Sequence, residues 1–249
     1  MDNLIDHYSY SSLSLYLRCP RQWKHKYIDK IPQKPSGNMQ LGKVMHKAIQ
    51  SALIEGANME ETIDSYLEGF NAEEGEAMVM TGDQLAWSKK AILNQDLNEW
   101  IQFEGAEGTG EVEIRMDFTM PGLPLPLVGY IDYISPDGTV WDFKTSGSSW
   151  NEEKAVKETQ PAFYAAALVH SGFELPIKFN YLVLVKNKTP KIQIFELKLT
   201  EKDLTRAYRM AADAHRGISA ELFYANPSGW WCSSKTCDFW NICEAGRIS

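Results

Sequence analysis

The chain has 249 residues, and 44% of them are hydrophobic, which is enough to bury the core of one large domain or two small ones. Its formal net charge of −8 argues against a protein that bulk charge alone holds on nucleic acid. The sequence has no apolar run of about 18 residues and no signal-peptide pattern, so we expect a cytoplasmic protein without membrane contact.

Charge is distributed unevenly along the first part of the chain. Residues 18–47 contain eight Lys or Arg and one acid, whereas residues 48–88 contain many acids and no Lys or Arg. A basic patch could hold phosphates while the remainder of the chain stays acidic. Solvated helix faces would produce the same pattern, and charge alone does not separate the two interpretations.

The first hundred residues are predicted to be helical. Residues 9–29 have apolar side chains at helical spacing, and Cys19-Pro20 is expected to kink or break the helix. Residues 41–55 carry a continuous apolar stripe bordered by His46, which is either a metal ligand or an ordinary half-buried histidine. Two further helices are predicted over residues 60–73 and 83–103, and a flexible linker over residues 105–110.

A β-strand is predicted over residues 111–118, where apolar and charged side chains alternate and Glu113 lies on the charged face. Two more strands follow at residues 129–132 and 140–145. Pro136, Asp137 and Gly138 between them suit a three-residue hairpin loop with a G1 bulge and a left-handed Gly138.

Counting outward from that loop gives the register of the hairpin. Tyr133 is expected opposite Trp141 and Asp132 opposite Asp142, with Lys144 on the same face by the two-residue period. Two opposed carboxylates destabilise a purely structural sheet, so the pair requires a divalent cation or a shared proton. The alternative is a solvent-facing edge hairpin, but the apolar flanks of both strands indicate burial.

The second half of the chain is also predicted to contain both helices and strands. A helix is predicted from Thr159 to about residue 171, with Gln160 and Tyr164 one turn apart, after a polar stretch with a short helical piece. Strands at residues 178–185 and 191–199 and a helix from Thr200 to about residue 217 complete the pattern. This order predicts a mixed α/β sheet flanked by helices.

Four cysteines occur in the chain, one at Cys19 and three near the end, at Cys232, Cys237 and Cys243. In a cytoplasmic protein they are more readily metal ligands or free thiols than disulfides. Four thiolates suit zinc or a [4Fe–4S] cluster, and the one-plus-three layout with aromatic neighbours favours iron–sulfur over zinc. Free buried cysteines are the remaining alternative.

These residues together resemble the RecB-like branch of the PD-(D/E)XK nucleases. More narrowly, they are similar to the iron–sulfur exonucleases that include the AddB nuclease domain and the CRISPR-associated RecB-like nucleases. The similarity covers nearly the whole chain, although the literal Pro-Asp is absent and the spacing between the second and third cysteines is longer than expected. The matching positions are Cys19-Pro20, Gly42 with His46, Glu113, Gly129 with Asp132, Asp142 with Lys144, Gln160 with Tyr164, and Cys232, Cys237 and Cys243.

The resemblance implies a restriction-endonuclease-like mixed central sheet in one nuclease domain over residues 1–249. Within it, residues 1–105 would form a mainly helical part, residues 106–216 the nuclease core and residues 217–249 a cysteine-rich segment. A four-cysteine metal site, most readily [4Fe–4S], would tie the N- and C-terminal segments together.

The resemblance also implies Mg²⁺- or Mn²⁺-dependent hydrolysis of DNA, as an exonuclease on single strands or DNA ends in recombination, repair or replication. Glu113 would hold a second metal or orient a water, and Lys144 would orient the attacking water or help to deprotonate it. Gln160 and Tyr164 would position the substrate strand or the lysine. The first metal would be bound by His46, Asp132, Asp142 and the Phe143 carbonyl.

Two readings of other classes compete with an enzyme. One is a DNA-end-binding scaffold or accessory subunit that partners a helicase–nuclease, a recombination protein or a CRISPR adaptation complex. The other is a zinc-stapled α/β binding protein. The intact Asp132, Asp142 and Lys144 favour the enzyme over both.

Overall fold

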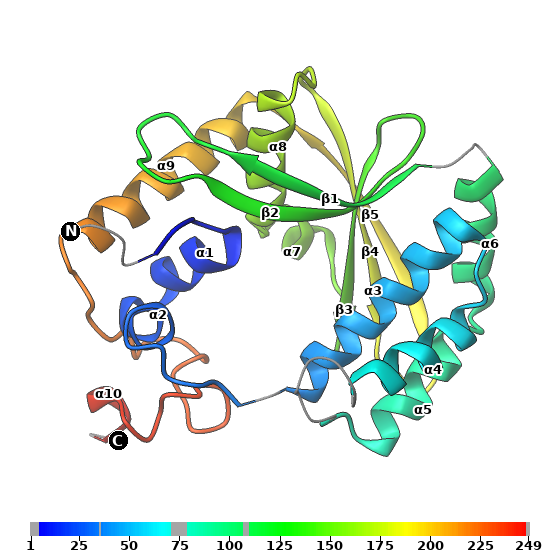
Figure 1. Cartoon of the computed structure of the whole chain (residues 1–249), viewed down its shortest axis with the longest axis horizontal. Helices are drawn as coiled ribbons and strands as arrows, with labels where there is room; N and C mark the ends of the chain where they lie inside the picture. The colour runs from blue at the N-terminus through cyan, green and yellow to red at the C-terminus, as the bar shows by residue number, and fades with distance from the viewer. Residues whose placement is uncertain (1–4, 35, 71–78, 107–109, 248–249) are drawn as a thin grey trace.

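A single five-stranded sheet lies at the centre of the computed structural model, which describes residues 5–34, 36–70, 79–106 and 110–247 (Figure 1). Its strands, which neighbour one another in chain order, are β1 (Glu111–Phe118), β2 (Leu127–Ile134), β3 (Val140–Ser146), β4 (Ile177–Val185) and β5 (Lys191–Leu199). Only β3 and β4 are parallel, and the other neighbouring strands are antiparallel.

Helices flank this sheet, as the sequence predicts. A parallel strand pair needs a crossover connection, which α7 and α8 supply between β3 and β4. The helices are α1 (Tyr10–Arg18), α2 (Pro20–Tyr27), α3 (Gly37–Glu55), α4 (Met59–Phe70), α5 (Gly82–Ala91), α6 (Gln95–Ala106), α7 (Glu152–Lys157), α8 (Gln160–His170), α9 (Glu201–Ser219) and α10 (Glu244–Arg247).

The helices cover both faces of the sheet and produce two apolar cores (Figure 1). Helices α1, α8 and α9 share the first core, whereas α3 to α6 share the second. Along β4, Tyr181 and Val183 belong to the first core, and Leu182 and Leu184 belong to the second. A strand that is buried on both faces needs a continuous apolar run, which is the sequence that β4 has.

The described residues before β1 form helices where helices were predicted, with one correction. The predicted break occurs at Cys19, between α1 and α2. The single helix predicted over residues 83–103 is wrong, because α5 ends at Ala91 and the side chain of Asn94 starts α6 by accepting the Leu97 N–H at 2.9 Å. Residues 105–106 of the predicted linker belong to α6; residues 107–109, and residues 71–73 of the helix predicted over 60–73, lie outside the described residues.

The hairpin between β2 and β3 forms as the loop residues predict. Gly138 is left-handed, with φ of 81°, and its N–H donates to the Ser135 carbonyl at 2.8 Å. The Ser135 N–H donates in turn to the Thr139 carbonyl at 2.9 Å. The predicted pairing of Tyr133 with Trp141 is confirmed.

The ladder does not continue to the predicted pairing of Asp132 with Asp142. Beyond Tyr133 and Trp141 the pairing of β2 with β3 ends, while β3 stays paired with β4 along its whole length. The Phe143 N–H therefore loses its strand partner and donates to the Asp132 side chain at 2.7 Å. A buried backbone donor needs an acceptor, and here a carboxylate replaces the missing carbonyl.

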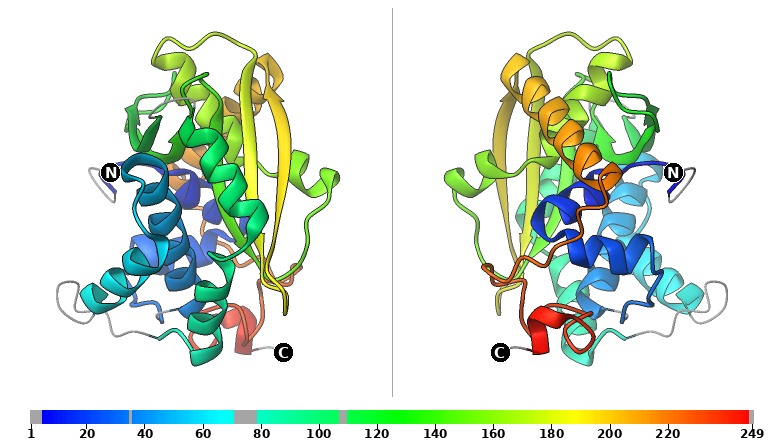
Figure 2. Two further views of the ribbon diagram at one scale, coloured as in Figure 1. Left: turned by 90° about the vertical axis from the view of Figure 1, so that its right-hand side faces the viewer. Right: turned by 90° about the vertical axis from the view of Figure 1, so that its left-hand side faces the viewer.

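The segment that follows α9 lies beside α1 and α2 (Figures 1 and 2). The Arg21 N–H donates to the Tyr224 carbonyl at 3.0 Å, and the Asn226 side chain donates to the Arg18 carbonyl at 2.9 Å. The cysteine-rich segment therefore lies against the helices that carry Cys19. Among the described residues, no helix has the length and apolarity that a membrane span requires. The single-domain organisation and its three parts stay a prediction.

We expect Asp137→Ala to destabilise the hairpin by about 1 kcal/mol at neutral pH, a value that allows for the partial exposure of this side chain. Asp137 accepts hydrogen bonds from Ser135 and Thr139 and pairs with Lys178 at 2.8 Å, and these contacts hold its pKa well below the ordinary value. The stabilisation is present above the unfolded-state pKa and is lost as the pH falls toward the lower folded-state pKa. Urea unfolding at pH 7 and below pH 3 measures it; an equal difference at both pH values would contradict this account.

Candidate active site

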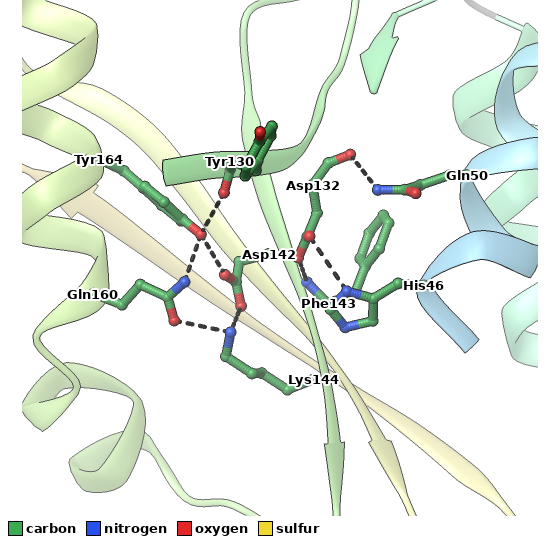
Figure 3. A network of polar contacts seen from close by, with 9 residues as sticks. All are labelled: His46, Gln50, Tyr130, Asp132, Asp142, Phe143, Lys144, Gln160 and Tyr164. Carbon is green, nitrogen blue, oxygen red and sulfur yellow. Dashed lines mark hydrogen bonds and ion pairs between the residues drawn. The ribbon is translucent and has the colours of Figure 1, made fainter. Parts of the chain in front are cut away.

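The predicted carboxylates, lysine and histidine line one cavity of about 380 Å³ between α1, α3, β2, β3 and α8. We refer to it as the active-site cavity. His46 comes from α3, Asp132 from β2, and Asp142 and Lys144 from β3 (Figure 3). Residues that are almost a hundred positions apart in the sequence therefore converge on one space.

Asp142 is the most buried member of this group, with no exposed surface. Its carboxylate pairs with the Lys144 ammonium and lies 3.0 Å from the Tyr164 hydroxyl. Burial raises the pKa of Asp142, and the Lys144 charge opposes that rise. Burial alone would lower the pKa of Lys144, but the Asp142 and Asp132 charges raise it overall.

Asp132 is held by a different set of groups. Its carboxylate accepts the Phe143 N–H at 2.7 Å and lies 3.3 Å from the His46 Nδ1, while the Gln50 amide donates to its backbone carbonyl at 3.2 Å. Burial would raise the pKa of Asp132, but His46, Lys144 and the Phe143 N–H together lower it. The same ion pair overcomes the effect of burial on His46 and raises the pKa of its imidazole.

Gln160 and Tyr164 connect α8 to β3. The Lys144 ammonium donates to the Gln160 carbonyl oxygen at 2.9 Å, and the Gln160 amide donates to the Tyr164 hydroxyl. That hydroxyl has one proton and two acceptors, the Asp142 carboxylate and the Tyr130 carbonyl, each at 3.0 Å. Gln160 and Tyr164 are one helical turn apart, which places both side chains on the same face of α8.

Glu113 does not lie in the active-site cavity. It is exposed on β1, and its φ of 51° is left-handed, which is uncommon for a residue with a side chain. The Phe143 side chain is buried in the second core, and the metal-binding role of its carbonyl stays a prediction.

Three groups near the site were not predicted. Gln50 follows His46 by one turn of α3, so the helical period contained the signal for it. Tyr10 lines the cavity and lies 3.1 Å from Thr159 through its hydroxyl. Tyr181 is the cross-strand neighbour of Asp142, a pairing that the parallel register of β3 and β4 creates. The Tyr181 hydroxyl is buried and has no hydrogen-bond partner among the described residues.

The four cysteines are free thiols in the described residues, and Cys19 is buried. The Gln22 amide lies 3.2 Å from the Cys237 sulfur, which ties the cysteine-rich segment to α2. Burial raises the pKa of Cys232 first, and the neighbouring Cys19 and Cys243 raise it further. The thiols are therefore close enough to repel one another as thiolates, but a four-cysteine metal site is not formed in the described residues.

The donor chemistry of the active-site cavity fits a divalent cation. Among the described residues no cluster of three or more His, Cys, Asp or Glu is already arranged around a metal position. Asp132, Asp142 and His46 nevertheless line the same cavity, and carboxylate oxygens with an imidazole are donors that Mg²⁺ and Mn²⁺ accept. In this structure the Lys144 ammonium supplies the positive charge that Asp142 requires.

Comparison with known proteins gives one family. The sequence matches the PD-(D/E)XK nuclease superfamily over residues 7–244. A solved structure of a candidate exonuclease from Eubacterium rectale is similar to this chain, with a TM-score of 0.61 and 13% sequence identity over 98% of this chain and 88% of that one. The solved structure SSO0001 has a TM-score of 0.47 and 16% identity over 97% and 87% of the two chains. No curated protein matches the sequence.

We expect Mn²⁺ to raise the melting temperature, with a stabilisation of about 2.7 kcal/mol at 100 times its Kd. The effect should grow as the pH rises through the raised pKa of His46, because protons compete with the cation for ligands. Without the cation, the melting temperature should fall as the pH rises, because the His46–Asp132 ion pair stabilises the fold at lower pH and is lost at higher pH. Thermal unfolding with and without Mn²⁺ measures both.

Asp132→Asn should abolish most of the Mn²⁺ shift. Asp117→Asn is the matched control, because Asp117 is an exposed β1 carboxylate outside the cavity and should leave the shift unchanged. An undiminished shift in Asp132→Asn would place the cation elsewhere.

Proposed function

The chain belongs to the PD-(D/E)XK nuclease superfamily, and from this premise we propose that it is a divalent-metal-dependent deoxyribonuclease acting as an exonuclease on single strands or DNA ends. The observation that carries the proposal is the convergence of Asp132, Asp142 and Lys144, with His46, on one cavity. Members of this superfamily are typically metal-dependent nucleases. The structural likeness to the Eubacterium rectale protein supports the fold, and that protein's description as a candidate exonuclease agrees with the proposed activity.

Asp132, Asp142, His46 and the Phe143 carbonyl would hold Mg²⁺ or Mn²⁺. When bound, the cation would stabilise negative charge on the attacking and leaving oxygens of the phosphodiester. Without a cation, the Asp142 and Asp132 charges raise the pKa of Lys144. Lys144 would contribute positive charge and hydrogen bonding toward a phosphate oxygen or the attacking water, or help to deprotonate that water.

Gln160 and Tyr164 act through other residues. Gln160 fixes the Lys144 ammonium, and Tyr164 contacts Asp142, so both define where charge is presented to the substrate. A misplacement of about 1 Å at such groups can reduce a rate by roughly a hundredfold. A role for Glu113 in holding a second cation has less support, because its side chain is exposed outside the cavity.

DNA is the proposed substrate, and the cations of α1 and α2 support it. Arg18, Arg21, Lys24 and Lys26 belong to α1 and α2, and α1 contributes Tyr10 and Ser11 to the cavity wall. Contacts with a phosphate backbone give salt-dependent binding without base preference. Recombination, repair or replication would supply such DNA ends.

The further assignment to the RecB-like branch, with a [4Fe–4S] cluster, is also part of the proposal. It is supported by the approach of the cysteine-rich segment to α2 and by the mutual effect of the thiols on their pKa values. Cys19, Cys232, Cys237 and Cys243 would be the ligands. Zinc is the less favoured occupant of the same four thiolates.

We expect Lys144→Ala to reduce DNA hydrolysis by roughly 10²- to 10³-fold and to retain DNA binding, because one preorganised charge is removed from the cavity. The assay is incubation of the purified protein with end-labelled single- and double-stranded DNA in Mg²⁺, Mn²⁺ or EDTA. Lys188→Ala is the control, since Lys188 is exposed on the β4–β5 turn. Full activity of Lys144→Ala would contradict the assignment, and a wild-type protein that binds DNA but cleaves under no condition would instead favour the scaffold function.

Anaerobically purified protein should be brown and contain iron and sulfide if the cysteines hold a cluster. Cys243→Ser should lose the colour and lower thermal stability, whereas Ser234→Ala in the same segment should keep both. Metal analysis measures the occupant. A colourless protein with one equivalent of zinc would replace the cluster by a zinc site.

A further inference from the structure

A second cavity, of about 260 Å³, lies between α1, α2 and the cysteine-rich segment. Arg18 of α1 and Lys26 of α2 contribute two cations to its wall, and Ser11, Ser14 and Gln22 contribute polar groups. Asp238 is its one lining carboxylate, and it accepts a hydrogen bond from Gln33 at 3.1 Å. The cavity therefore has an excess of positive charge inside a chain whose overall charge is −8.

The two cations lack an ionic partner in the described part of the chain, where no carboxylate lies within 4.0 Å of either one. Lys26 is half-buried, and burial together with the Arg18 charge lowers its pKa, against the opposing influence of Asp238. An ammonium that is partly removed from water and faces a second cation is unfavourable in isolation. A bound anion would relieve both penalties.

Gln22 forms a fixed part of the wall of the second cavity. Its side chain is 8% exposed, its carbonyl oxygen accepts from the Arg18 guanidinium at 3.3 Å, and its amide contacts the Cys237 sulfur at 3.2 Å. One buried side chain thus orients the guanidinium and connects it to the cysteine-rich segment. This is a prepared position for the cation, unlike that of a solvated surface arginine.

The second cavity and the active-site cavity are joined along α1. Ser11 lines both of them, and Arg18 lies seven residues further along the same helix, which is about 10 Å at 1.5 Å per residue. A strand with one phosphate in the active-site cavity can therefore reach Arg18 with another.

We propose that the second cavity binds a backbone phosphate of the DNA strand close to the phosphate that is cleaved. The proposal rests on the proposed nuclease function, whose substrate it extends along α1. Arg18 and Lys26 supply the charge, Ser11 lies on the path between the two cavities, and Gln22 holds Arg18. These are contacts to the backbone, so the site fixes the register of the strand without reading its bases.

The test is binding of labelled single-stranded DNA by fluorescence anisotropy in EDTA, where no cleavage occurs, at several salt concentrations. Arg18→Gln/Lys26→Gln should weaken binding about tenfold and reduce the slope of log K against log salt by about 0.7 for each lost phosphate contact. Arg18→Lys/Lys26→Arg keeps the charges and should bind like the wild type. Lys188→Gln/Lys191→Gln, on the β4–β5 turn beside α5, is a charge-matched control on the other side of the molecule and should also bind like the wild type (Figure 1).

A variant that should strengthen DNA binding, where the others weaken it, makes the test sharper. Asp238→Asn removes the only carboxylate of the cavity wall and should tighten DNA binding several-fold, an effect that general damage to the fold does not produce. In cleavage assays with Mn²⁺, Arg18→Gln/Lys26→Gln should raise KM for a long strand about tenfold and leave kcat unchanged, since the cavity is separate from the reacting phosphate.

The outcomes separate this inference from the proposed function. A wild type that cleaves DNA, with the glutamine and asparagine variants binding as tightly as it does, would overturn the second cavity as a phosphate site and leave the nuclease intact. A wild type that binds DNA through Arg18 and Lys26 but does not cleave would refute the nuclease and retain a binding site for the strand. A wild type that does not bind single-stranded DNA at all overturns the inference.

Discussion

A carboxylate that is closed off from water needs a cation or hydrogen-bond donors, and Asp142 places that requirement at the centre of the sheet. Lys144 meets it from the same strand, two residues further along. Tyr164 and Gln160 meet it from α8, through the hydroxyl that contacts Asp142 and the amide oxygen that holds Lys144. The rotation of α8 is fixed as a result, because a shift by one residue would turn both side chains away from β3.

Burying these charged groups costs folding free energy, and this cost indicates a role other than stabilising the fold. A buried ion pair contributes little net stability, since desolvation of the two charges offsets their attraction, and apolar residues in the same positions often serve a fold equally well. The Asp142–Lys144 pair and the Asp132–His46 pair lie side by side in one cavity. Two such pairs are better explained by chemistry than by folding, and any cation that engages Asp142 leaves the Lys144 ammonium in need of another anion. Under the proposed function, a phosphate of the substrate would satisfy that need.

Local rules account for the parts of the site that were predictable from the sequence. Pro136 and Gly138 determine the loop, the loop determines the pairing of Tyr133 with Trp141, and the helical period places Gln160 beside Tyr164. The same period, applied from His46, would have found Gln50. These inferences need only turn geometry and the spacing of neighbouring residues.

The remaining features depend on long-range pairing that no local pattern contains. Asp132 and Asp142 lie outside the ladder because the pairing of β2 with β3 ends at Tyr133 and Trp141, and the carboxylate of Asp132 contacts the Phe143 N–H and not its predicted partner. Tyr181 is the neighbour of Asp142 through the parallel register of β3 and β4. Glu113 alternates correctly with its apolar neighbours, yet its side chain is exposed outside the cavity. Each of these depends on where two distant segments meet.

The role of the basic residues near the N-terminus was also not predictable from the sequence. The basic run over residues 18–47 could be a solvated helix face or a phosphate site, and the sequence does not separate them because both expose cations. What separates them is Lys26, which loses part of its hydration to the cysteine-rich segment more than 200 residues away. A solvated face has no reason to desolvate an ammonium beside a guanidinium. In the proposed binding of the DNA strand, the cysteine-rich segment would contribute by forming one wall of the cavity.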